Sequence, residues 1–129
     1  MSRPLHDELR DELAANLDLT PEDLNRAVFA LLAYGRGWSK ARIGRLLGVS
    51  RARVHQRVER YQRYVADEPE RWPVTKEILE QSPGAIAEHW WNPELTPGHW
   101  ADPEFADSMI GFVTHGGPAD YIEQVSGNA

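Results

Sequence analysis

The stretch from Ser39 to Val58 decides the fold, and it reads SKARIGRLLGVSRARVHQRV. Ser39 can cap a short helix that runs through Leu47, because a serine side chain accepts a hydrogen bond from a free amide of the first helical turn. The following Gly-Val-Ser breaks the chain, and Ser50 can cap a longer helix to about Val65. The pattern therefore predicts two helices joined by a tight turn.

Two glycines in this stretch favour a close crossing of the helices. Gly44 stands where the two helices would approach each other most closely, and Gly48 suits a left-handed backbone position that other residues adopt only at a cost. The apolar side chains that would lock the second helix across the first are Ile43, Leu47, Val49, Val54 and Val58. We expect a packed helix pair rather than two independent helices.

Together, the caps, glycines and apolar residues of this stretch resemble the helix-turn-helix motif of bacterial and phage repressors, sigma-factor region 4 and centromere-binding partition proteins. The resemblance covers about twenty residues, and every position of the core pattern is filled. Arg42 and Arg45 are the departures, because the family more often has acidic or neutral polar residues there. The resemblance implies binding of double-stranded DNA, with the second helix of the motif in the major groove.

A third helix is predicted directly before the motif, over residues 20–35. Thr20 is a candidate cap, Pro21 suits the first helical turn, and Gly35 suits a helix end. If this helix is the support of a tri-helical unit, the resemblance extends to about forty residues. The expected DNA-binding domain then spans residues 20–65.

The resemblance also implies roles for single side chains. In this family, base edges are contacted from the first two turns of the second helix. The corresponding residues here are Arg51, Ala52, His55 and Gln56. Arginine can pair with guanine, glutamine with adenine, and an alanine methyl can pack on thymine. Phosphate contacts, which position the protein without reading sequence, are expected from Ser39, Lys40, Arg42, Arg45, Ser50, Arg53, Arg57 and Arg60.

Charge is strongly segregated along the chain, although the net charge is only −6. Residues 36–64 hold nine Lys or Arg and one acid, a net charge of +8, whereas residues 1–35 carry −4 and residues 65–129 carry −10. A solvated helix face usually mixes both signs, and a basic stripe is typical of phosphate binding. The charge pattern therefore favours the same segment as the part that contacts DNA.

Composition restricts the other classes of function. The chain has no cysteine, which excludes disulfides and thiolate metal clusters, and its longest apolar run, residues 27–34, is too short to span a bilayer. The acidic start of the chain does not form the apolar core of a signal peptide. We therefore expect a cytoplasmic protein without membrane contact, metal or cofactor.

The flanking segments also have helical patterns, so we expect an all-α fold. Residues 1–19 form an amphipathic helix whose apolar face carries Leu5, Leu9, Leu13 and Leu17. Seven of the nine prolines fall after Asp67 and divide the rest of the chain into short helices. These helices are predicted over residues 74–81, 83–91, 103–115 and 118–125. Residues 66–129 would then form a small, irregular helical lobe.

This lobe is acidic and rich in tryptophan, which favours contact with protein over contact with phosphate. Its candidate interface residues are Trp72, Trp90, Trp91, Trp100 and Phe105. Homodimerisation through the lobe is the favoured arrangement, because a single helix-turn-helix covers only one half-site. The alternative is a monomer in which the lobe packs on the leucine face of residues 1–19 and completes the core.

Sequence-specific control of transcription by a bacterial or phage repressor is the function that these features favour. Two alternatives stay open. The layout is similar to that of small phage terminase subunits, which join a helix-turn-helix to an oligomerising helical segment. The acidic lobe could instead mimic DNA and cover the basic stripe, which would give a protein-interaction module. An enzyme is not expected, since His89, His99 and His115 lack the spacing of a hydrolytic metal motif.

Overall fold

Every described element of the chain is a helix. The computed structural model describes residues 4–81 and 98–114. Its elements are α1 (Leu5–Asn16), α2 (Pro21–Gly35), α3 (Lys40–Leu47), α4 (Arg51–Asp67), the 3-10 helix η1 (Pro69–Arg71), α5 (Pro73–Glu80) and α6 (Pro103–Thr114). The all-α prediction is confirmed over these ranges, and the helices predicted over residues 83–91 and 118–125 lie outside them.

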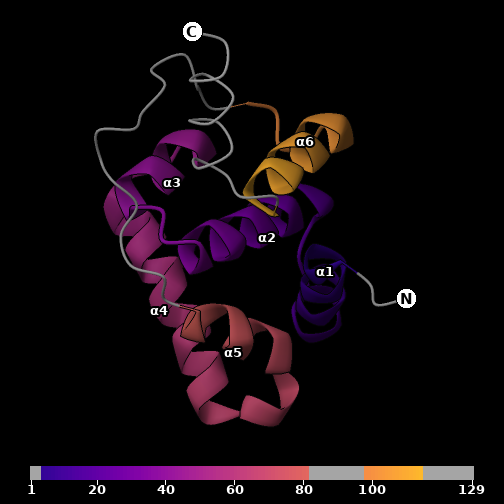
Figure 1. Cartoon of the computed structure of the whole chain (residues 1–129), viewed down its shortest axis with the longest axis vertical. Helices are drawn as coiled ribbons and strands as arrows, with labels where there is room; N and C mark the ends of the chain where they lie inside the picture. Colours follow the sequence, from indigo (N-terminus) through magenta and orange to yellow (C-terminus); the bar gives the residue numbers. More distant parts are fainter. Residues whose placement is uncertain (1–3, 82–97, 115–129) are drawn as a thin grey trace, which may run out of the picture.

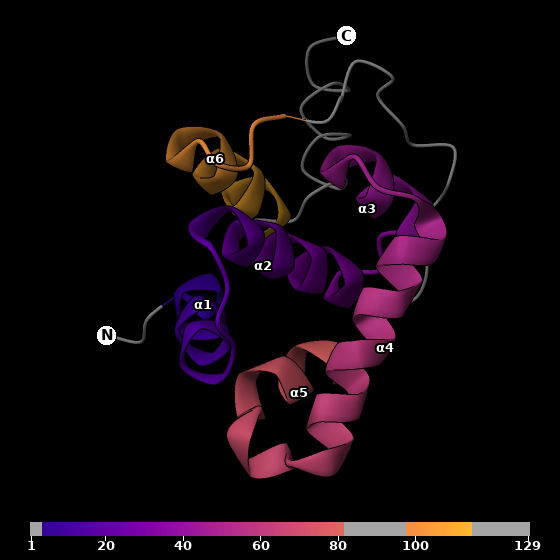
Figure 2. The same cartoon turned by 180° about the vertical axis from the view of Figure 1, so that it is seen from behind.

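Helix α2 lies at the centre of the fold, in contact with α1, α3, α5 and α6 (Figures 1 and 2). Its start is fixed locally, because Thr20 Oγ1 accepts a hydrogen bond from the amide of Asp23 at 3.1 Å and Pro21 occupies the first turn. Its fully buried side chains include Val28, Phe29 and Ala33. Apolar residues on several sides of α2 allow neighbouring helices to pack around it.

Helix α4 is the longest helix in the described part of the chain, and it crosses one end of α2 (Figure 1). Helix α3 packs on the N-terminal part of α4, whereas α5 packs near its C-terminal end. The side chains of α4 that are buried are Val54, Val58 and Tyr61. Their spacing of four and three residues places them on one face, so the opposite face of α4 is left to solvent.

Helix α1 is joined to α5 by the carboxylate of Glu12. One oxygen of Glu12 accepts a hydrogen bond from the amide of Val74 at 3.0 Å, and the other accepts from the amide and the hydroxyl of Thr75, both at 2.7 Å. The residue at the N-cap of α5, Trp72, supplies no capping hydrogen bond. Glu12 therefore provides, from a distant helix, the acceptors that the first turn of α5 needs.

Two of the predicted interface aromatics belong to the core instead. Trp72 is 4% exposed, and its ring stacks on Tyr64 with centroids 5.0 Å apart. Trp100 is 1% exposed and packs on Phe29 and Phe105, with centroid distances of 4.9 and 5.2 Å. Buried rings of this kind stabilise the fold and are not available to a second chain. Phe105 is half-buried, whereas Trp90 and Trp91 lie outside the described residues.

The helices on both sides of the predicted DNA-binding domain share its hydrophobic core. Helix α5 contacts α1, α2 and α4, and α6 contacts α2 and α1. Leu9 and Leu13 of the predicted leucine face are fully buried. The described part of the lobe therefore packs as the core-completing alternative requires, on the helix that carries the leucine face.

Candidate nucleic-acid interface

The predicted caps and turn of the motif are present in the structure. Ser39 Oγ accepts a hydrogen bond from the amide of Arg42 at 3.2 Å, and Ser50 Oγ accepts one from the amide of Arg53 at 3.1 Å. Gly48 ends α3 with a φ of 75°, the left-handed conformation expected there. Both helices of the motif therefore begin at the serine that the sequence indicates.

Gly44 is the point of closest approach between α3 and the turn. A Cβ atom at this position would lie 2.6 Å from the carbonyl oxygen of Val49 and 3.2 Å from that of Ser50. The obstacle is backbone, which cannot rotate away as a flexible side chain can. Of the predicted locking residues, Ile43, Leu47, Val54 and Val58 are buried and Val49 is half-buried. Backbone contact at Gly44 and this apolar set together fix α4 across α3.

The four predicted base-reading residues lie together at the start of α4. Arg51, Ala52, His55 and Gln56 are all exposed on its first two turns. A hollow of about 560 Å³ runs along one edge of this group, and it is lined by Lys40, Ser50, Arg51, Ala52 and His55. An exposed helical face fits the width of the major groove of B-DNA. The contacts with individual bases stay a prediction.

His55 is held between two charged neighbours. Lys40 Nζ donates a hydrogen bond to His55 Nδ1 at 2.7 Å, and His55 Nε2 contacts the carboxylate of Glu59 one turn further along α4. A neutral ring with its proton on Nε2 satisfies both contacts, because Nδ1 then accepts and Nε2 donates. Glu59 was not among the predicted site residues. Its spacing of four residues from His55 is the signal that could have identified it.

The predicted phosphate contacts differ in exposure. Arg45, Ser50, Arg53 and Arg60 are exposed, whereas Ser39, Lys40 and Arg57 are half-exposed. Arg42 is only 5% exposed, which corrects its assignment as a phosphate contact. It precedes the buried Leu46 by one turn, so both side chains lie on the packed side of α3. Seven of the eight predicted side chains are at least partly open to solvent.

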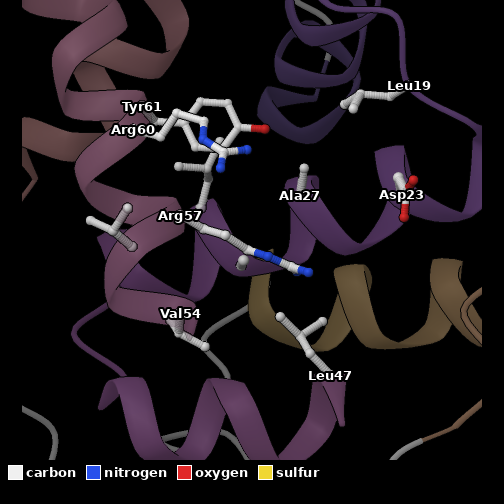
Figure 3. A pocket seen from close by; sticks show the side chains of 11 residues that line it. Leu19, Asp23, Ala27, Leu47, Val54, Arg57, Arg60 and Tyr61 are labelled. Atoms are coloured by element: carbon white, nitrogen blue, oxygen red, sulfur yellow. The ribbon is translucent and has the colours of Figure 1, made fainter. Parts of the chain in front are cut away.

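A pocket of about 210 Å³ lies between α2 and α4 (Figure 3). The polar residues that line it are Asp23, Arg57, Arg60 and Tyr61. Partial burial lowers the pKa of Arg57 below its usual value, and the nearby charges of Arg26 and Arg53 lower it further. Burial also raises the pKa of Tyr61 to about 12. Arg57 thus differs from Arg60, the other predicted phosphate contact at this pocket, because Arg57 is partly buried whereas Arg60 is exposed.

The described part of the chain offers neither a metal site nor a membrane span. Within residues 4–81 and 98–114, no group of three or more His, Asp or Glu side chains is arranged to hold a metal ion. None of the helices in these ranges combines the length and the apolar character needed to cross a bilayer. His99 is exposed, and His89 and His115 lie outside the described residues.

Comparison with known protein families identifies the segment that contains this site. Residues 20–64 match the family model of the homeodomain-like domain. The matched segment begins at Thr20, the cap of α2, and covers α2, α3 and most of α4. Neither the curated proteins nor the solved structures give a match to the chain. The helix-turn-helix predicted from the sequence is therefore confirmed, together with its supporting helix.

Proposed function

We propose that this protein, in which residues 20–64 form a homeodomain-like helix-turn-helix domain, binds double-stranded DNA sequence-specifically and acts as a transcriptional repressor of a bacterium or phage. The observation that carries the proposal is the exposed group at the start of α4, formed by Arg51, Ala52, His55 and Gln56. In this proposal the protein binds DNA in the cytoplasm, and its function requires neither catalysis nor a cofactor.

The exposed group offers three kinds of recognition chemistry on adjacent turns. Arg51 and Gln56 can each make paired hydrogen bonds with one base, to guanine and adenine respectively, and the methyl of Ala52 suits thymine. His55 is already oriented by Lys40 and Glu59. Because fewer rotamers have to be lost on binding, an oriented ring costs less entropy than a free one.

Cations lie on both sides of the exposed group. Arg53, Arg57 and Arg60 follow one another at spacings of four and three residues, so they share one flank of α4. Lys40 of α3 lies at the other flank, where it contacts His55. A helix in the major groove has a phosphate backbone on each side, and this arrangement provides a positive charge for each of them.

Selection of bound duplexes from a random pool, with the full-length protein, tests the proposal. We expect one enriched motif. Arg51→Ala or Gln56→Ala should weaken binding to it by about 1–3 kcal/mol and relax the preference at one base pair. The matched control is Arg60→Ala, which should weaken all sequences about equally.

Two results of this selection would overturn the proposal. A pool without enrichment would reject sequence-specific binding, and an unchanged motif for Arg51→Ala would reject the placement of α4 in the groove. The symmetry of the motif also reports the stoichiometry. A palindrome with half-sites about 34 Å apart, one DNA turn, is expected of a homodimer, and an asymmetric single site is expected of a monomer.

A further inference from the structure

The pocket between α2 and α4 has an apolar interior. Its inner wall is formed by Ala27, Ala30, Leu31, Leu47, Val54 and Val58. Two of these residues are alanines of α2 and two are valines of α4, and side chains this small leave space between the two helices. The volume is about 210 Å³. An apolar cavity of roughly 150 Å³ is enough to hold benzene, so the pocket has room for one ring or a branched alkyl group.

The mouth of the pocket carries Arg57, whose guanidinium forms no ion pair within the described part of the chain. Within residues 4–81 and 98–114, Arg57 makes no ion pair or hydrogen bond, and it lines the pocket on the α4 side (Figure 3). Arg26, which lies near enough to repel it, is already paired with Glu22 at 2.9 Å. Asp23 lines the pocket from α2 but makes no ion pair with Arg57.

The electrostatic state of Arg57 favours an anion at this point. Partial burial is the main cause that lowers its pKa, followed by the charges of Arg26 and Arg53, whereas the smaller effect of the Asp23 carboxylate raises it. A guanidinium that has lost part of its hydration and has cationic neighbours is stabilised by a bound negative charge. Arginine also matches a carboxylate geometrically, since its paired N–H groups can donate to both oxygens. Arg60, exposed at the same mouth, adds positive charge.

We infer that this pocket binds a small organic monocarboxylate, with its carboxylate on Arg57 and a compact apolar body, a single aromatic ring or a branched alkyl group, against the alanines and valines between α2 and α4. The apolar wall distinguishes this ligand from a bare phosphate or sulfate, which would gain nothing from it. The volume excludes larger cofactors, because pockets for drug-sized ligands have about 300–1,000 Å³.

Occupation of the pocket would also change DNA binding, a consequence that rests on the proposed function. Arg57 is among the side chains expected to contact phosphate, and one guanidinium cannot serve a bound carboxylate and a DNA phosphate equally well. The ligand should therefore weaken binding to DNA. By thermodynamic linkage, DNA should weaken binding of the ligand by the same factor. The pocket would then be the effector site of the regulator.

Titration of the full-length, ¹⁵N-labelled protein with benzoate, followed by NMR, tests the ligand. We expect saturable shifts in the amides of α2 and α4. Benzamide, which has the same ring without the charge, and inorganic phosphate, which has charge without the ring, should each bind at least about tenfold more weakly. Failure of benzoate to bind saturably would overturn the proposal, and so would phosphate binding as tight as that of benzoate.

Variants locate the binding in the pocket. Arg57→Gln should weaken benzoate binding by about tenfold, and Ala27→Leu, which fills the space, should abolish it. Arg63→Gln is the matched control, because Arg63 lies exposed on the same helix and neither lines the pocket nor acts on the pKa of Arg57. Equal losses in Arg57→Gln and Arg63→Gln would mean non-specific attraction and overturn the site. If Ala27→Leu does not fold, the comparison of the two arginine variants is sufficient to decide whether benzoate binds in this pocket.

The link to DNA is tested separately. With a duplex enriched from the random pool, benzoate should raise the apparent Kd until the pocket is saturated, and Ala27→Leu should remove this sensitivity while still binding DNA. A benzoate-insensitive Kd would overturn the effector role. If no duplex is enriched, the proposed function fails, whereas the NMR titration still decides whether the pocket binds carboxylates.

Discussion

The indole nitrogen of Trp100 donates a hydrogen bond to the carbonyl oxygen of Leu46, with an N–O distance of 3.0 Å. Leu46 lies in the last turn of α3, where carbonyl groups have no partner within the helix. The two carbonyls before it, those of Gly44 and Arg45, accept from the amides of Val49 and Gly48. A residue far along the chain thus completes the end of α3 at the turn of the DNA-binding motif.

Trp100→Phe should lower the free energy of unfolding by about 2–3 kcal/mol, because it leaves a cavity and an unpaired buried carbonyl at Leu46. Trp72→Phe is the matched control, since Trp72 is also buried but its side chain makes ring contacts and no hydrogen bond within the described residues. Urea unfolding followed by circular dichroism measures both. Equal losses in the two variants would show that the hydrogen bond to Leu46 contributes nothing.

Gly44→Ala should destabilise the protein by more than 2 kcal/mol and abolish DNA binding, because a Cβ atom would lie 2.6 Å from the backbone oxygen of Val49. This contact can be relieved only if α3 moves away from the turn, and such a movement changes the angle between α3 and α4. Gly48→Ala provides a comparison. Gly48 is exposed, so the expected cost is the strain of a φ of 75°, about 1 kcal/mol, and the variant should keep its DNA affinity at a temperature where it is folded. Thermal unfolding and fluorescence anisotropy measure the two effects.

Tyr61 should make stability fall at high pH. Its pKa is about 12 in the folded chain, against 10.0 when unperturbed, so between these values the unfolded chain has lost a proton that the folded chain keeps. The stabilisation by the protonated form is complete below pH 10 and is lost as the pH rises to about 12, by roughly 2–3 kcal/mol. Urea unfolding at pH 9 and pH 11 measures the first half of this loss, about 1.4 kcal/mol. Tyr61→Phe should lose less over the same interval, and an identical loss would contradict the assignment.

The motif was predictable because its determinants are local. Ser39, Ser50, Gly44 and Gly48 each act on backbone groups within five residues, and the structure places all four as the sequence indicates. Capping and left-handed turns depend on interactions between residues that are close in the sequence, so they can be predicted from the sequence alone. The same is true of Thr20 at the start of α2.

The errors concern contacts between distant segments. Trp72 and Trp100 were predicted at an interface, but the sequence does not state whether an aromatic ring faces its own core or a second chain. The burial of Arg42 follows from the packing around α3 rather than from its helical position alone. The pocket beside Arg57 was not predictable either, because it depends on the spacing of α2 and α4 and on which alanines face it.

The salt dependence of DNA binding should reflect which cations the structure leaves open. Five predicted phosphate-binding cations are exposed or half-exposed, and they are Lys40, Arg45, Arg53, Arg57 and Arg60. Each cation on a phosphate contributes about −0.9 to the slope of log affinity against log salt concentration, which gives a slope of about −4 to −5. Arg60→Ala should reduce its magnitude by about 1, whereas Arg42→Ala should leave it unchanged, because Arg42 is buried. Fluorescence anisotropy on one duplex between low and moderate salt measures these slopes.

Two outcomes would contradict the prediction. A DNA affinity that hardly changes with salt concentration would exclude the basic flanks of α4 as the docking surface. A slope reduced as much by Arg42→Ala as by Arg60→Ala would mean that α3 rearranges when DNA binds.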